Sequence, residues 1–207
     1  EKDNGAMRTN QLSVIPTRVK KTVNVYGTDI DIDEYVNITY YFGPDGKAIK
    51  GFHTIDGQTY YFNEKGWALD GIIHEKDGDY FLQNYHLIYN QFVNTYSDNQ
   101  DDKTITGTYY VNGEGKVQVG WLNKDNNRYY LDPEAGGKVT YGWKEIDNKF
   151  YHFTEKDNQD SAGQLIRNQI YQDGDILVTI DQEGIVTRST EKRQTFVKDA
   201  LGNSYYV

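Results

Sequence analysis

The sequence predicts an all-β protein, a β-solenoid of stacked β-hairpin repeats of about 20 residues each. Two markers point to this fold: aromatic triplets recur at a regular interval, and a glycine followed by a large residue recurs between them. Composition is the third observation, because 19 of the 207 residues are Tyr and only 37% are hydrophobic. Aliphatic side chains are too few for a thick core. Tyrosines must therefore supply much of the buried surface, which they can do while their hydroxyls stay in water.

The aromatic triplets set the period of the repeat. Their first residues lie 20, 20, 29, 20 and 21 positions apart. The step of 29 contains a polar, loop-like insertion near 94–107, and the step of 21 contains the longer turn "DPEAGG". The triplets are Tyr40-Tyr41-Phe42, Tyr60-Tyr61-Phe62, Tyr80-Phe81-Leu82, Tyr109-Tyr110-Val111, Tyr129-Tyr130-Leu131 and Phe150-Tyr151-His152. The second markers are Gly51-Phe52, Gly71-Ile72, Gln91-Phe92, Gly120-Trp121, Gly142-Trp143 and Gln169-Ile170.

Each unit has the pattern of a β-hairpin. The stretch "QTYYF" is rich in β-forming residues, and "NEKG" or "GPDG" is typical of a tight turn. Alternation along the strand sends Tyr60 and Phe62 to one face and Tyr61 to the other. One hairpin buries too little surface to stand alone, so neighbouring hairpins must stack. Helix is expected to be nearly absent.

The chain is expected to be an excerpt of a longer array. Residues 1–36 form an N-terminal lead-in that fits the register poorly, although "TVNVYGTDIDIDEYV" alternates like a strand. Residues 37–186 form the repeat array. Residues 187–207 begin a further repeat that is truncated after its aromatic residues, "SYYV".

The stretches "GFHTIDGQTYYFNEKGWALDG" and "GWKEIDNKFYHF" resemble a known repeat superfamily. They are similar to glucan-binding (cell-wall-binding-type) repeats, above all to the glucan-binding region, domain V, of bacterial glucansucrases. Choline-binding modules and clostridial toxin repeats share the motif. The resemblance implies a non-catalytic module that binds α-glucan of the dextran type and tethers a secreted glucansucrase to its product. It also implies a location outside a Gram-positive bacterium or on its surface, and the catalytic domain of the parent enzyme as a partner.

Two groups of residues are candidates for binding an α-glucan or oligosaccharide. Sugars need a flat aromatic floor and a few polar groups at its edge. In the related repeats a Gln-x-Lys segment precedes the glycine-aromatic step, and only Lys50 matches it here. The first group is Lys50, His53, Gln58, Tyr60, Tyr61 and Trp67; the second is Trp121, Tyr129, Tyr130, Tyr141, Trp143 and Lys149. For each aromatic residue the alternative is packing against a neighbouring hairpin.

Two other functions stay open at this point. A quaternary ammonium needs two or three rings around it, and Trp121, Tyr130 and Trp143 are the residues that suit such a choline cage. A surface adhesin holding choline, teichoic acid or a partner protein is therefore one alternative. An architectural spacer is the other.

Composition argues against several classes of function. The formal net charge of −9 disfavours nucleic-acid binding, which needs clustered cations. No apolar run approaches the roughly 20 residues of a membrane-spanning helix. The chain has no cysteine, which removes disulfides, zinc–thiolate sites and thiol nucleophiles together.

Catalysis and metal binding have little support, and no cofactor or metal is expected. The four histidines are scattered over different units, and the acids cluster in predicted turns as solvated surface. Two aspartate runs offer oxygen ligands for calcium, but neither has the spacing of an EF-hand loop. These candidates are His53, His74, His86 and His152; Glu155, Asp157 and Asp160; Asp29, Asp31 and Asp33; and Asp98, Asp101 and Asp102.

Overall fold

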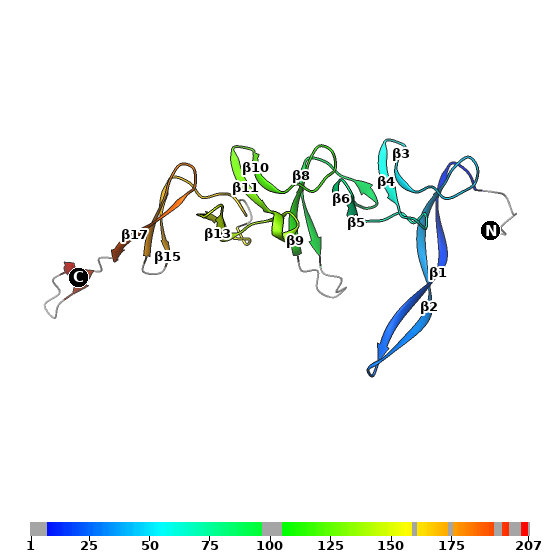
Figure 1. Ribbon diagram of the computed structural model, residues 1–207, viewed down its shortest axis with the longest axis horizontal. Helices are drawn as coiled ribbons and strands as arrows, with labels where there is room; N and C mark the ends of the chain where they lie inside the picture. Colours follow the sequence, from blue (N-terminus) through cyan, green and yellow to red (C-terminus); the bar gives the residue numbers. More distant parts are fainter. Residues whose placement is uncertain are drawn as a thin grey trace. The chain divides into compact units, whose positions relative to one another are not determined.

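The computed structural model describes residues 8–96, 105–158, 161–173, 176–192, 196–198 and 204–206 (Figure 1). The described part is all-β, as the sequence predicts: it consists of antiparallel strands and one short 3-10 helix, η1 (Pro133–Ala135). Across these ranges, no helix has the length and apolar character needed to span a membrane. The chain divides into two compact units, one of Glu1–Gln91 with Val111–Val117 and the other of Phe92–Tyr110 with Gln118–Val207.

The first unit contains a long hairpin, a short hairpin and a three-stranded sheet. The long hairpin is formed by the two longest strands of the described residues, 15 residues each (Figure 1). The sheets of the first unit are ordered β1-β2, β3-β4 and β5-β6-β7. The strands are β1 (Gln11–Val25), β2 (Thr28–Phe42), β3 (Gly51–Ile55), β4 (Gln58–Phe62), β5 (Gly71–Glu75), β6 (Gly78–Gln83) and β7 (His86–Leu87).

The hairpin of β3 and β4 shows how the local sequence forms the fold. Its two-residue turn is Asp56-Gly57, and both residues have positive φ, 51° and 79°. Such turns match the right-handed twist of the flanking strands, and glycine adopts this φ without strain. Tyr60 and Phe62 are buried, whereas Tyr61 lies on the opposite face and is half-buried. The predicted alternation is therefore confirmed.

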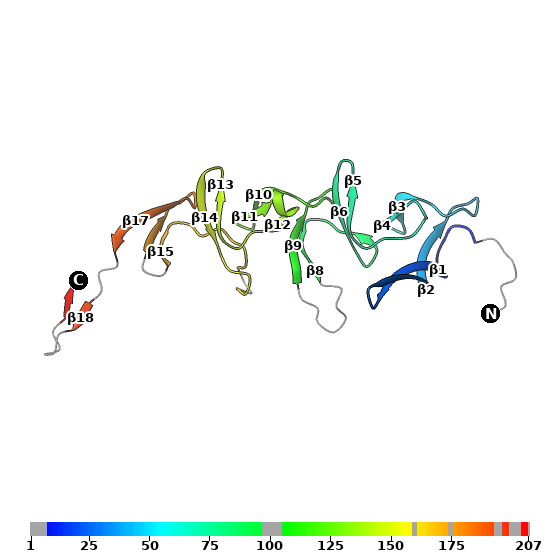
Figure 2. The same cartoon turned by 60° about the horizontal axis from the view of Figure 1, so that its bottom comes forward.

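The second unit repeats this design (Figure 2). Its sheets are ordered β10-β11-β12-β9-β8, β13-β14, β15-β16-β17 and β18-β19. The strands are β8 (Gln91–Tyr96), β9 (Ile105–Val111), β10 (Gly120–Lys124), β11 (Asn127–Asp132), β12 (Lys138–Val139), β13 (Gly142–Ile146), β14 (Lys149–Phe153), β15 (Gln169–Asp173), β16 (Ile176–Ile180), β17 (Val186–Lys192), β18 (Phe196–Lys198) and β19 (Ser204–Tyr206).

Buried side chains gather in several small clusters, about one for each hairpin. One cluster joins Tyr60, Phe62 and Ala68. Another joins Ile73, Leu82 and Leu87 of the β5-β6-β7 sheet. One strand position supplies the deepest residue in successive hairpins: Phe62, Leu82, Leu131 and Phe153 each pair with the glycine of the second marker. These four residues and Val111 are each at most 1% exposed. Burial of this position explains why the sequence repeats there.

The predicted lead-in, insertion and C-terminal segment can each be compared with strands of the structure. Strand β1 pairs with β2 along its whole length, so β2 continues from the predicted lead-in through position 36 into the first aromatic triplet. Strands β8 and β9 flank the predicted insertion near 94–107, of which residues 97–104 lie outside the described part. At the C-terminal end β18 pairs with β19. The division at 36 and 186 itself stays a prediction.

Candidate functional site

The structure divides the first predicted binding group between two faces of one hairpin. His53 pairs with Tyr60, and Phe52 pairs with Tyr61, so these pairs point in opposite directions. Tyr60 is only 9% exposed, and its hydroxyl lies 2.8 Å from Nε2 of His86. Its ring also contacts the His86 imidazole, with 4.7 Å between centroids. Tyr60 is thus a packing residue.

Tyr61 is held by the next hairpin. Its ring lies 4.8 Å from that of Phe52, and its hydroxyl donates a short hydrogen bond to the carboxylate of Glu75 on β5. This hydrogen bond, together with burial, raises the pKa of Tyr61 to about 12. Both properties indicate a structural role that links two hairpins.

The polar members of the first group are exposed. Nζ of Lys50 lies 3.1 Å from Oε2 of Glu64, and Nε2 of His53 lies 2.9 Å from the carbonyl oxygen of Lys50. Gln58 is exposed where β4 begins. Trp67 follows β4 and lines a different hollow, together with residues of β1 and β2. The structure therefore brings Lys50 and His53 together and places Trp67 in other surroundings.

The second group is also divided. Trp121 pairs with Tyr130 across β10 and β11, which puts Tyr129 on the opposite face. The Trp121 ring lies 5.1 Å from Tyr130 and 5.0 Å from Tyr151 of β14. Burial, with the charge of Asp132 as the next cause, raises the pKa of Tyr130. These three rings form one aromatic cluster.

A cation of the chain itself lies on this cluster. Cζ of Arg128 is 3.9 Å from the centroid of the Trp121 ring, at the distance of a cation–π contact. Arg128 thus covers one face of the Trp121 ring. Trp143, the third residue of the predicted cage, stacks on His152 with 3.9 Å between centroids. Lys149 is exposed where β14 begins.

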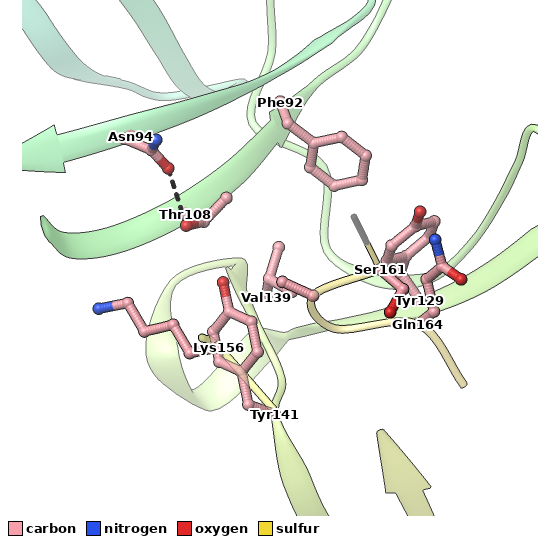
Figure 3. A pocket seen from close by; sticks show the side chains of 10 residues that line it. Phe92, Asn94, Thr108, Tyr129, Val139, Tyr141, Lys156, Ser161 and Gln164 are labelled. Carbon is pink, nitrogen blue, oxygen red and sulfur yellow. Dashed lines mark hydrogen bonds between the residues drawn. The ribbon is translucent and has the colours of Figure 1, made fainter. Parts of the chain in front are cut away.

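Tyr129 and Tyr141 do come together, in a surface groove of about 320 Å³ (Figure 3). The groove combines aromatic rings with amide, hydroxyl and ammonium groups. Its other lining residues are Phe92, Asn94, Thr108, Val139, Lys156, Ser161, Ala162 and Gln164. This combination of flat apolar walls and a few polar groups is the one that saccharides require.

Neighbouring elements hold the walls of this groove in place. The Phe92 ring lies 5.0 Å from Tyr129 and 5.1 Å from Tyr110, and Thr108 of β9 donates a hydrogen bond of 2.8 Å to Asn94 of β8 (Figure 3). On the opposite wall, the backbone N–H of Gln164 donates to the Thr154 hydroxyl over 2.9 Å. The groove is therefore formed before any ligand arrives.

Sequence reasoning missed most of this groove. It identified Tyr129 and Tyr141 but not Phe92, Asn94 or Gln164. Strand alternation places Phe92 and Asn94 on one face of β8, and that signal was available. The pairing of Asn94 with Thr108 on β9 was not predictable, because the register of the strands on either side of the polar insertion near 94–107 cannot be read from the sequence.

The histidines, which the sequence predicts to be scattered, have separate partners. Nδ1 of His74 lies 2.8 Å from Asp79, whereas His86 contacts Tyr60 and His152 contacts Trp143. Within the described ranges, no three His, Cys, Asp or Glu side chains are grouped to hold a metal ion. Asp29, Asp31 and Asp33 each accept a hydrogen bond from a residue of β1. Asp98, Asp101, Asp102 and Asp160 lie outside the described residues.

Comparison with known proteins confirms the resemblance seen in the sequence. Residues 50–66 and 119–134 match the family described as "Putative cell wall binding repeat". Glucosyltransferase-S of Streptococcus mutans is 31% identical in an alignment of 132 residues that covers 45% of this chain. The chain spans only 9% of the length of that relative.

Two solved structures share the fold. Choline binding protein F of Streptococcus pneumoniae matches with a TM-score of 0.56 and 22% identity, over 73% of this chain and 44% of its own. CbpJ of Streptococcus pneumoniae matches with a TM-score of 0.61 and 20% identity, over 94% of this chain and 62% of its own. The chain thus resembles glucan-binding and cell-wall-binding repeats in sequence and choline-binding proteins in fold.

Proposed function

We propose that this chain is a non-catalytic carbohydrate-binding module that binds α-glucan of the dextran type. It tethers a glucansucrase, secreted by a Gram-positive bacterium or held at its surface, to the glucan product. The identity to Glucosyltransferase-S supports a parent enzyme of this class. The catalytic domain of that enzyme is then a partner of the module.

The groove between Phe92, Tyr129 and Tyr141 is the observation that carries this proposal. A glucosyl ring has an apolar face of C–H groups that packs on an aromatic ring, and a rim of hydroxyls that bonds to amide and hydroxyl groups. The side chains of Asn94 and Gln164 supply such amides at the edge of the groove (Figure 3). The predicted residues Lys50, His53, Gln58, Trp121, Trp143 and Lys149 stay proposed contacts of the glucan elsewhere on the surface.

We infer in addition that the hairpins stack as a β-solenoid. Rings of successive hairpins contact one another within each unit: Phe52 lies 4.7 Å from Tyr80, and Trp121 lies 5.0 Å from Tyr151. The fold shared with choline-binding proteins supports the same arrangement. A single groove of this kind binds a sugar at about millimolar strength, roughly 4 kcal/mol. Several grooves on one array raise retention through effective concentration.

A choline-binding or cell-wall-binding surface module is the second candidate. The family description of residues 50–66 and 119–134 favours it. Against it stands Arg128, whose guanidinium occupies one face of Trp121 and leaves only the other face for a quaternary ammonium. A cation is poorly placed beside another cation in so small a space. We therefore rank glucan above choline.

Affinity electrophoresis through dextran-loaded gels tests the proposal. The unmodified chain is expected to be retarded, and Tyr141→Ala and Gln164→Ala to weaken binding by roughly five- to tenfold, because a stacked ring and an amide hydrogen bond are lost. Phe150→Ala is the matched control, since it removes a 52% exposed ring outside the groove. Circular dichroism verifies that each variant is folded.

Two results would contradict the proposal. Retention on a choline resin, with no retardation by dextran, would establish the second candidate instead. Equal weakening by Phe150→Ala and Tyr141→Ala would place the glucan outside the groove.

A further inference from the structure

A second hollow, of about 700 Å³, lies in the first unit beside the long hairpin. Strand β1 contributes Arg18, Lys20 and Lys21, and the turn after β4 contributes Lys65 and Trp67. We call these five residues the basic groove. It shares no residue with the groove proposed for glucan, and its binding is independent of that proposal.

Positive charge is concentrated at this place. The whole chain carries a formal net charge of −9, yet four cationic residues, together with one acidic residue, Glu34, line one hollow. Two of the cations are neutralised in part: Arg18 pairs with Asp33, and Nζ of Lys21 lies 3.5 Å from Glu34. In the part of the chain that the structure describes, no carboxylate lies within ion-pair distance of Lys20 or Lys65. An anion repelled by the rest of the surface is therefore attracted here.

Trp67 is fixed in this groove by its turn. The side chain of Asn63 accepts hydrogen bonds of 2.9 Å from the N–H of Lys65 and 3.0 Å from the N–H of Trp67. The N–H of Asn63 donates to the Trp67 carbonyl over 2.9 Å, and Ala68 donates to Thr39 of β2 over 2.8 Å. Trp67 is half-buried, so part of its surface stays exposed.

The turn itself does not require a tryptophan. The same position after the turn glycine is occupied by Lys47 in the preceding unit and by Lys116 after the fourth triplet. Lys116 sits in a turn with the same backbone hydrogen bonds to Asn112. The exceptional ring at position 67 therefore serves something other than turn formation. Nζ of Lys65 lies 4.6 Å above it, so ring and cation form one surface.

We propose that the basic groove binds an acidic saccharide, that is, a sugar ring bearing a phosphate or carboxylate group. The sugar ring packs on the exposed surface of Trp67, while Lys20 and Lys65 bind the anionic group by charge-assisted hydrogen bonds. Phosphodiester-linked glycans and uronic acid polymers share this chemistry. A neutral glucan lacks the anion, and an acidic peptide lacks the flat ring with C–H faces.

Binding to defined polymers tests the proposal with the full chain. The probes are polygalacturonate, a poly(glycerol phosphate) bearing glucosyl groups, neutral dextran and poly-glutamate. Binding is measured by the quenching of tryptophan fluorescence at low ionic strength, since salt screens exposed charges. We expect at least one of the two acidic glycans to bind, and the one that binds identifies whether carboxylate or phosphate is preferred.

A charge-matched pair of variants locates the site. Lys20→Glu with Lys65→Glu is expected to weaken the binding of the acidic glycan at least tenfold, because both contacts to the anion become repulsive. Lys47→Glu with Lys76→Glu changes the net charge equally at two exposed lysines elsewhere, and is expected to leave binding within about twofold. Trp67→Phe, which keeps a ring, is expected to bind but to lose most of the quenching.

Three outcomes would overturn the proposal. The first is failure of both acidic glycans to bind the unmodified chain. The second is equal loss in the two lysine pairs, which would reduce the effect to net charge. The third is poly-glutamate binding as tightly as the acidic glycans, which would make the groove a peptide site.

Discussion

At the scale of single residues, the two tyrosines of one triplet have different partners and the same purpose. Tyr60 turns inward and bonds to His86, whereas Tyr61 turns outward and donates to Glu75 on the next hairpin. A tyrosine suits both positions because its ring fills space and its hydroxyl reaches a polar group beyond it. Many of the repeated rings in the described part of the chain are therefore used to join hairpins.

Because Tyr61 donates a hydrogen bond to Glu75, the stability of the folded state is expected to fall at alkaline pH. The folded-state pKa of Tyr61 is raised to about 12, above its ordinary value of 10.0. The folded state therefore holds this proton more tightly than the unfolded state. The resulting stability is fully present below pH 10 and is lost as the pH rises towards 12. We expect Tyr61→Phe to lower the free energy of unfolding by about 1 kcal/mol at neutral pH. Urea denaturation at several pH values checks this, and a gap from the unmodified chain that stays constant between pH 9 and 12 would contradict it.

At the scale of elements, the hairpins were predictable and their contacts were not. A turn such as Asp56-Gly57 and the alternation of "QTYYF" are local signals, so the structure confirms both. The groove of Phe92, Asn94 and Tyr141 depends on how strands on either side of a polar insertion pair, which no local pattern encodes. The cover that Arg128 forms on Trp121 was missed for a related reason, since a charged residue on an exposed strand face is ordinarily solvated.

Two turn glycines, Gly66 and Gly57, differ in how closely other parts of the chain pack against them. Gly66 and Gly57 have nearly the same φ, 77° and 79°. A Cβ at Gly66 would lie 2.6 Å from Cβ of Ala48, whereas a Cβ at Gly57 would meet nothing within 4 Å. Gly57→Ala is expected to cost about 1 kcal/mol of unfolding free energy, from backbone strain alone. Gly66→Ala is expected to cost about 2 kcal/mol more, because the turns must move apart. Thermal unfolding measures the stability of the two variants. An equal loss of unfolding free energy in both would contradict the expectation, because it would show that the contact with Ala48 adds nothing to the loss.

At the scale of the whole molecule, stability is spread over many small clusters of buried side chains. Among the described residues the clusters are small: that of Phe62 contains three buried residues, that of Phe153 four and that of Leu131 five. In proteins built of such repeats, each unit is stabilised by its own packing and by its immediate neighbours. A substitution in one cluster is then expected to destabilise mainly the hairpins around that cluster. The described residues also fall into two compact units, with Phe62 in one and Phe153 in the other.

Local stability makes a test of this design possible. Phe62→Ala removes a fully buried ring from the first unit, and Phe153→Ala is its counterpart in the second. Each is expected to cost about 3 to 5 kcal/mol in its own cluster. By amide hydrogen exchange, Phe62→Ala should then release protection in β3 to β6 and leave β13 and β14 protected, while Phe153→Ala should do the reverse. Uniform loss of protection in either variant would instead show one cooperative core, because the cost would then be shared by every hairpin of the chain.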